Sequence, residues 1–244
     1  MKKLIALILA LCTVFLVASC DKNETPQPSQ NGGETVDGVE VFKNLYAVSA
    51  PTKVVTTQKS VIGTVTLNGG STLVTGALSN GSAATVYTYK YELLQSIEEG
   101  AGEIITPIMT TIEGSREYVE GEGERYDGGA WDSEAGNFAP TPGSIAINLD
   151  ASKLRDCVYS SGNNIKTLSF SVKKKDVAAV LGSDGISSDV NVVITANEAV
   201  ITGITISYTE TLVPEDEDLL YPDVEITIST VYSYGIEEIT LVKN

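Results

Sequence analysis

Histidine is absent from this sequence of 244 residues, and cysteine is rare. Without histidine the chain cannot form a serine–histidine or cysteine–histidine catalytic pair, and most zinc and copper sites are excluded as well. A glycine-rich phosphate loop is also missing, because the glycines fall in predicted turns between strands and not between a strand and a helix. Catalysis would have to rest on carboxylates, and no pair of them is singled out. We therefore expect a protein that is not an enzyme.

The few cysteines leave no partner for a disulfide within the folded part of the chain. Cys12 and Cys20 belong to the first twenty residues, and Cys157 is the only thiol that follows them. An intrachain disulfide is thus excluded for the mature domain. Its stability must come from an apolar core and from the hydrogen bonds between strands.

Positive charge is scarce too. The chain has 16 lysine and arginine residues against 32 aspartate and glutamate residues, which gives a formal net charge of -16 at pH 7. An acidic surface repels nucleic acids and anionic lipid headgroups, so no nucleic-acid partner is expected. The same charge favours solubility and the binding of cations.

A long apolar run occurs only near the N-terminus. Lys2 and Lys3 precede the apolar residues 4–17, and the small residues Ala18 and Ser19 stand directly before Cys20. This order is typical of a secretory signal and is short for a membrane span. Residues 16–20 resemble the lipobox of bacterial lipoproteins, with valine at a position where leucine is commoner. The resemblance implies that residues 1–19 are removed and that Cys20 is acylated, for example with palmitate, and anchors the chain.

Residues 20–38 have the composition of a flexible tether. They are rich in polar residues, proline and glycine, and contain almost no apolar side chain that could be buried. Asp21 and Glu24 follow closely after the cysteine that is predicted to carry the lipid. This placement of acidic residues resembles that in surface lipoproteins of the Bacteroidota. This resemblance implies an outer-membrane location and leaves open whether the domain faces the periplasm or the outside.

From residue 39 to 244 the pattern predicts a single β domain. Apolar and β-branched residues alternate with polar ones along about ten segments, separated by turn residues such as Asn68-Gly69-Gly70. Short helices are predicted near residues 150–157 and 176–181. Strands joined by short turns are antiparallel, so we expect an all-β fold that is mainly an antiparallel sandwich or barrel, with one or two short helices.

Residues 113–143 interrupt the alternation with glycines, carboxylates and aromatic residues. Aromatic rings and carboxylates together suit a sugar, because the rings stack on its C–H groups and the carboxylates accept its hydroxyl hydrogens. A glycan site is thus one interpretation, and the alternative is that Trp131 folds back over the core. The candidate ligand-binding residues are Tyr118, Tyr126, Asp127, Trp131, Asp132 and Phe138.

Two further patterns have both a functional and a structural interpretation. The acidic residues Asp216, Asp218 and Asp223 offer hard oxygen ligands that suit Ca²⁺, or they form a solvated loop. Tyr87, Tyr89 and Tyr91 stand at alternate positions of one strand, where they form a ligand face or one wall of the core.

Together these features predict a lipid-anchored cell-envelope protein that acts as a non-catalytic binding or structural module. Its partners would be the membrane, through the N-terminal lipid, and either a glycan or another envelope protein. One alternative is a glycan-binding surface lipoprotein that uses residues 113–143. Another is a fimbria-like assembly subunit whose edge strands pair with a neighbour.

Overall fold

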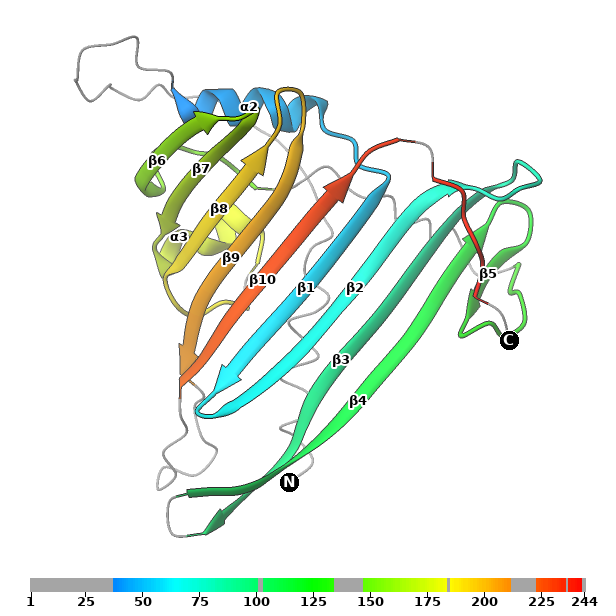
Figure 1. The fold of residues 1–244 in the computed structure, drawn as a ribbon, viewed down its shortest axis with the longest axis horizontal. Coiled ribbons are helices and arrows are strands. Elements are labelled where there is room, and N and C mark those ends of the chain that lie inside the picture. The colour runs from blue at the N-terminus through cyan, green and yellow to red at the C-terminus, as the bar shows by residue number, and fades with distance from the viewer. Residues whose placement is uncertain are drawn as a thin grey trace.

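The computed structural model describes residues 37–100, 103–133, 147–183, 185–211, 223–235 and 237–242. Within these ranges ten strands form one sheet in the order β5-β4-β3-β2-β1-β10-β9-β8-β7-β6 (Figure 1). The helices are α2 (Gly38–Val48) and α3 (Lys174–Leu181). The strands are β1 (Lys53–Ile62), β2 (Val65–Ala77), β3 (Ala83–Gly100), β4 (Glu103–Val119), β5 (Gly123–Tyr126), β6 (Leu154–Gly162), β7 (Ile165–Val172), β8 (Val190–Ala196), β9 (Ile201–Thr211) and β10 (Asp223–Ser233).

Every pair of neighbouring strands is antiparallel. Most neighbours are also consecutive in the chain, and β1 and β10 meet in the middle of the sheet, so that the two ends of the folded chain form its central seam. The prediction of an all-β, mainly antiparallel fold with one or two short helices is confirmed, and of the predicted sandwich or barrel the described strands form a single open, barrel-like sheet, not two packed sheets. None of the described helices has the length and apolar character needed to cross a membrane.

One face of the sheet packs against both helices, and we call it the helix face. Opposite residues of antiparallel strands share a face, so the register of the strand pairs defines this side across the whole sheet. On β7–β10 it is apolar and buried. Its main core residues are Leu168, Phe170, Val192, Ile194, Ile204, Ile206, Ile226 and Ile228, and they contact Phe42 and Leu45 of α2 and Val177 and Val180 of α3.

Helix α2 begins at an aspartate cap and was not predicted from the sequence. Asp37 Oδ1 accepts the N–H groups of Val39 and Glu40 at 3.0 and 3.3 Å. Phe42 is fully buried beneath the helix. At the other end Ser49 donates its hydroxyl to a helix carbonyl and accepts the N–H of Ile201, which joins α2 to β9.

The opposite side of the sheet, the outer face, carries a smaller apolar cluster over β2–β5. Ala84, Val86, Val119 and Ile239 are buried there, and Trp131 packs against them. Residues 237–242 cover this cluster, and they cross in front of β2–β5 in the view of Figure 1. Backbone hydrogen bonds between Ala77 and residues 237 and 239 hold this C-terminal segment against the sheet.

The structure corrects several local predictions. The β1–β2 turn lies at residues 63–64, where Gly63 has a φ of 57°, while the predicted turn at Asn68-Gly69-Gly70 lies inside β2. Residues 150–157 do not form a helix, because a tight turn follows Asp150 and β6 starts at Leu154. The helix predicted near residues 176–181 is confirmed as α3, which ends at Gly182 with a φ of 66°.

Candidate functional site on the helix face

The helices cover only one half of the helix face. Helix α2 makes its main contacts with β6, β7 and β9, and α3 with β7. On the other half, formed by β1–β5, most of the side chains are half-buried, not fully buried. This half is therefore the part of the helix face that remains partly accessible among the described residues.

Three tyrosines of β3 form the centre of this accessible half. Tyr87, Tyr89 and Tyr91 occupy alternate positions, so their side chains leave the same face of the strand. The ring centroids are 6.0 Å apart between Tyr87 and Tyr89, and 6.4 Å apart between Tyr89 and Tyr91. All three side chains are half-buried. They form a continuous aromatic row along the strand.

Glycines on the neighbouring strands make room for these rings. Gly114 of β4 lies opposite Tyr89, and a Cβ at Gly114 would come within 2.5 Å of the tyrosine hydroxyl. Gly69 of β2 lies opposite Tyr91, and a Cβ there would overlap the tyrosine ring. Tyr89 therefore reaches over β4 and Tyr91 over β2, which widens the aromatic surface across three strands.

The β4–β5 hairpin extends the same face with two more tyrosines. Tyr118 is paired with Glu124, and Arg116 with Tyr126, so all four residues lie on the helix face. The Arg116 guanidinium lies 5.2 Å from the centre of the Tyr126 ring. It also forms an ion pair with Glu124, in which Nη2 donates to Oε2 at 2.9 Å. Glu124 is buried, whereas Tyr126 is 58% exposed.

Neutral polar side chains lie beside the tyrosines on this face. Gln58 of β1 donates its amide to the Ser60 hydroxyl at 3.3 Å. Thr56 shares a hydrogen bond of 3.3 Å with Thr230, and Ser71 of β2 lies opposite both Thr56 and Tyr89. The accessible half thus combines phenol rings with amide and hydroxyl groups.

The outer face of the same hairpin carries a second ion pair, in which the carboxylate is on β4 and the guanidinium is on β5. Glu117 of β4 accepts the Nε–H of Arg125 at 2.5 Å and the backbone N–H of Val242 at 2.6 Å. Arg125 donates to the Val242 carbonyl and lies 4.6 Å from the centre of the Trp131 ring. Glu117 is fully buried. Trp131 packs against the small apolar cluster of the outer face.

Two further predicted ligand-binding residues, Asp127 and Asp132, make backbone contacts around β5. Asp127 follows β5, has a φ of 48°, and accepts the Ser115 N–H at 2.6 Å. Asp132 lies beside β5 and forms an antiparallel bridge with Glu124, in which the two residues exchange two backbone hydrogen bonds. Phe138 lies outside the described residues. Of the five candidates that the structure describes, Tyr118 and Tyr126 are the ones that share the helix face with the β3 tyrosines.

Of the three residues predicted to bind calcium, the structure describes Asp223. Asp223 starts β10 and accepts the Thr211 hydroxyl at 2.7 Å, while Asp216 and Asp218 lie outside the described residues. Within the described ranges, no three histidine, cysteine, aspartate or glutamate side chains come together in a way that could hold a metal ion.

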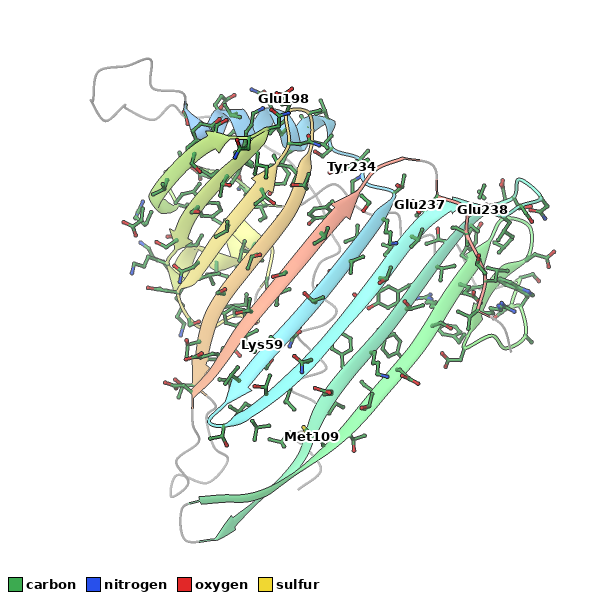
Figure 2. All side chains as sticks on the ribbon, in the orientation of Figure 1. Lys59, Met109, Glu198, Tyr234, Glu237 and Glu238 are labelled. Atoms are coloured by element: carbon green, nitrogen blue, oxygen red, sulfur yellow. The ribbon has the colours of Figure 1, made fainter. Side chains whose placement is uncertain are left out.

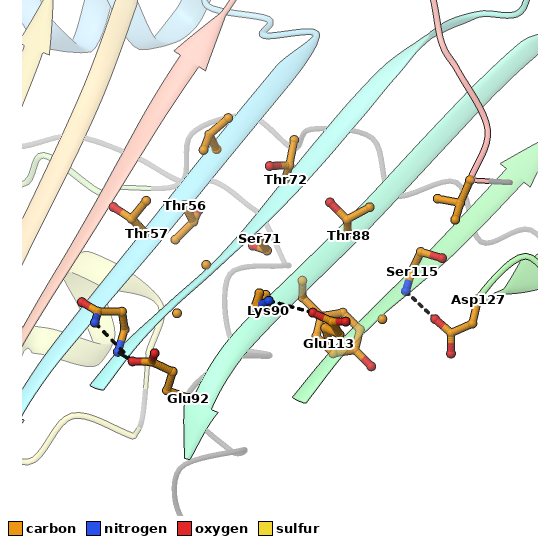
Figure 3. Close-up of a pocket in the computed structure, with 17 residues that line it drawn as sticks. Thr56, Thr57, Ser71, Thr72, Thr88, Lys90, Glu92, Glu113, Ser115 and Asp127 are labelled. Atoms are coloured by element: carbon orange, nitrogen blue, oxygen red, sulfur yellow. Dashed lines mark hydrogen bonds and ion pairs between the residues drawn. The ribbon is translucent and has the colours of Figure 1, made fainter. Parts of the chain in front are cut away.

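A shallow polar groove of about 850 Å³ lies on the outer face of β1–β4 (Figure 3). Threonine and serine side chains line it, and its charged groups are engaged with neighbours. Lys90 pairs with Glu113 at 2.9 Å, and Glu92 accepts the backbone N–H of Asn68 at 2.8 Å. The groove contains few apolar side chains to desolvate, so it has the character of a solvated sheet face.

Sequence reasoning did not identify Arg116, Glu124 or the two glycines as parts of this surface. The alternation of apolar and polar residues did indicate the two glycines, since Gly69 and Gly114 stand in strand positions where a side chain is expected. A glycine inside a strand often marks the close approach of another group. Which group approaches depends on the strand register, and that is not encoded locally.

Comparisons with known proteins give only remote likenesses. No family model and no curated protein matches the chain. Solved structures that align with this chain include the lipoprotein LppX of Mycobacterium tuberculosis, with 9% identity, coverage of 82% of this chain and 97% of LppX, and a TM-score of 0.33. A DUF1329 family protein from Desulfovibrio piger has 11% identity, coverage of 82% and 93%, and a TM-score of 0.22.

Proposed function

We propose that this protein is a lipid-anchored, non-catalytic binding module of the cell envelope. We further propose that it binds its ligand on the tyrosine face, which we define as Tyr87, Tyr89, Tyr91, Tyr118 and Tyr126 together with Arg116. The observation that carries the proposal is that these rings are gathered on the one part of the helix face that the described helices leave accessible. Aromatic side chains carry much of the energy of protein interfaces.

The small number of carboxylates among the described side chains of this face supports a binding role over a hydrolytic one. Among the described side chains of β1–β5 that point to the helix face, Glu124 is the only carboxylate. It is buried and paired with Arg116. Hydrolysis of a glycoside by the usual mechanism needs two carboxyl groups at a defined separation, one of them able to donate a proton.

The anchoring part of the proposal rests on the N-terminal sequence. Residues 16–20 resemble a lipobox, and α2 starts at Gly38, so residues 21–36 would connect the lipid to the domain. Acyl chains contribute about 0.8 kcal/mol for each buried methylene, so several chains on one cysteine hold a protein firmly. We propose an outer-membrane location because acidic residues follow closely after Cys20.

Two experiments test the two parts separately. Cells grown with a labelled fatty acid should label the wild-type protein and leave the Cys20→Ala variant unlabelled. The purified protein should bind at least one component among separated glycan, lipid and peptide fractions of the envelope, and Tyr126→Ala should weaken that binding. Label on the Cys20→Ala protein would refute the anchor. Binding that tolerates every substitution on the tyrosine face would refute the site.

A further inference from the structure

We infer that the ligand of the tyrosine face is a neutral glycan, which rests on the proposed binding function of that face. The inference follows from three properties of the described side chains, namely their charge, their hydrogen-bonding groups and the arrangement of the rings. The first two properties each exclude a class of ligand, and the third indicates the length of the ligand.

Charge excludes strongly ionic ligands. The formal net charge of the chain is -16, so an anionic ligand meets a repulsive field. The positive group on the face, Arg116, is already paired with Glu124. A cationic ligand would find no carboxylate with capacity to spare, since Glu124 is buried in that same pair. A neutral ligand avoids both costs.

The hydrogen-bonding groups exclude a purely aliphatic ligand. An acyl chain laid on this face would remove from water the Ser71, Tyr87 and Tyr89 hydroxyls, and also the amide oxygen and second amide N–H of Gln58, which are left over after its bond to Ser60, without offering them partners. Each unpaired polar group costs roughly 1–3 kcal/mol when it is buried. Most of the buried aliphatic residues of the same sheet face are on β7–β10, in one cluster with α2 and α3, and Ile62, Val65 and Leu67 continue that cluster at the adjoining ends of β1 and β2.

A glycan matches both features that remain. Its C–H groups pack on aromatic rings, and its hydroxyls both donate to and accept from amide and hydroxyl side chains. The centroid separations of 6.0 and 6.4 Å along β3 place three rings in succession. Tyr89 and Tyr91 also reach over the two neighbouring strands. This surface is longer than one sugar ring and suits an oligosaccharide.

The glycines opposite Tyr89 and Tyr91 allow a substitution that moves a tyrosine ring without removing it. In Gly114→Ala the new Cβ would come within 2.5 Å of the Tyr89 hydroxyl, at the far end of a flexible side chain, so the ring is displaced while the fold is kept. Gly162→Ala is a matched control, because nothing lies within 4 Å of the added Cβ. Thr88→Ala is a second control, since Thr88 lies between Tyr87 and Tyr89 on the same strand but faces the polar groove on the outer face.

Calorimetric titration of the purified protein with neutral oligosaccharides from glucan, mannan and xylan tests the inference. We expect at least one to bind, and we expect Gly114→Ala, Tyr89→Leu and Tyr126→Ala each to weaken it about tenfold, the loss of one aromatic contact. Gly162→Ala and Thr88→Ala should bind like the wild type. Thermal unfolding of every variant establishes that it is folded.

The outcomes separate this inference from the proposed function. If no neutral oligosaccharide binds, or if Thr88→Ala weakens binding as much as Tyr89→Leu, the glycan inference is overturned. If an acidic oligosaccharide or a phosphatidylcholine vesicle binds instead, and Tyr126→Ala weakens it, the glycan inference fails while the tyrosine face stands. If every ligand that binds tolerates Gly114→Ala, Tyr89→Leu and Tyr126→Ala, both proposals fail.

Discussion

Substitution of Glu117 by glutamine tests how the C-terminal segment is held to the sheet. The carboxylate accepts one hydrogen bond from Arg125 and one from the Val242 N–H, and it is fully buried. A glutamine keeps the volume but offers only one oxygen, so its NH₂ group faces one of these two donors. The Arg125 charge then stays in a mostly buried site without a counter-charge.

The expected cost is large for a conservative change. Breaking a buried ion pair by removing one partner costs about 3–5 kcal/mol, because an uncompensated charge remains. For a chain of this size, that loss corresponds to a fall in Tm of roughly 6–20 °C. The exposed pair Lys90–Glu113, whose side chains are 69% and 66% exposed, gives a comparison in the same sheet. Glu113→Gln should cost less than about 1 kcal/mol.

Urea unfolding followed by Trp131 fluorescence is the suitable assay, since this ring lies beside Arg125. The double variant Glu117→Leu with Arg125→Met should be more stable than Glu117→Gln alone, because an apolar pair of similar volume leaves no buried charge. A loss below about 1 kcal/mol in Glu117→Gln, equal to that of Glu113→Gln, would refute the reasoning.

Three further predictions concern other parts of the chain. Asp37→Ala removes the side-chain cap of α2 and should cost about 1 kcal/mol in urea unfolding, whereas Asp37→Ser should restore most of it. Phe42→Ala empties a fully buried site and should cost about 3–5 kcal/mol, and an unchanged midpoint would show that α2 does not contribute to the core. Hydrogen bonds from the Ser152 side chain, from Lys153 and from the Ser152 N–H lower the pKa of Asp150 to about 2. The folded pKa thus lies below the unfolded one, so the stability that wild type gains over Asp150→Asn should be complete above about pH 4 and vanish toward pH 2. A difference that is constant from pH 6 to pH 2 would contradict this origin.

The strands were predictable because their alternation survives in the fold. The rows of apolar residues that predicted β7, β8 and β10 are the buried rows of the helix face. Turns were harder to predict, because glycine has two uses. Gly63 turns the chain between β1 and β2, whereas Gly69 stays in the strand and leaves space for the Tyr91 ring. Local sequence does not distinguish these uses, since the second depends on a residue twenty-two positions away.

The composition of the candidate site was partly predictable, but its division between two faces was not. Arg116 and Glu117 are adjacent in β4 and point to opposite faces, and the same holds for Glu124 and Arg125 in β5. A sequence segment rich in aromatic and acidic residues therefore supplies two unrelated surfaces. Helix α2 escaped prediction because its cap, Asp37, ends a polar segment that has the composition of a tether.

The meeting of β1 and β10 at the centre of the sheet has a consequence for the order of export. If the chain leaves the cytoplasm N-terminus first, as the leader predicts, β1–β5 emerge long before β10. The early hairpins can pair with one another, but the unpaired side of β1 and the carboxylate of Glu117 must wait for residues 223–242. The two halves of the sheet would thus close around their seam only when translocation is nearly complete, and an arrested chain would expose that open edge to other proteins.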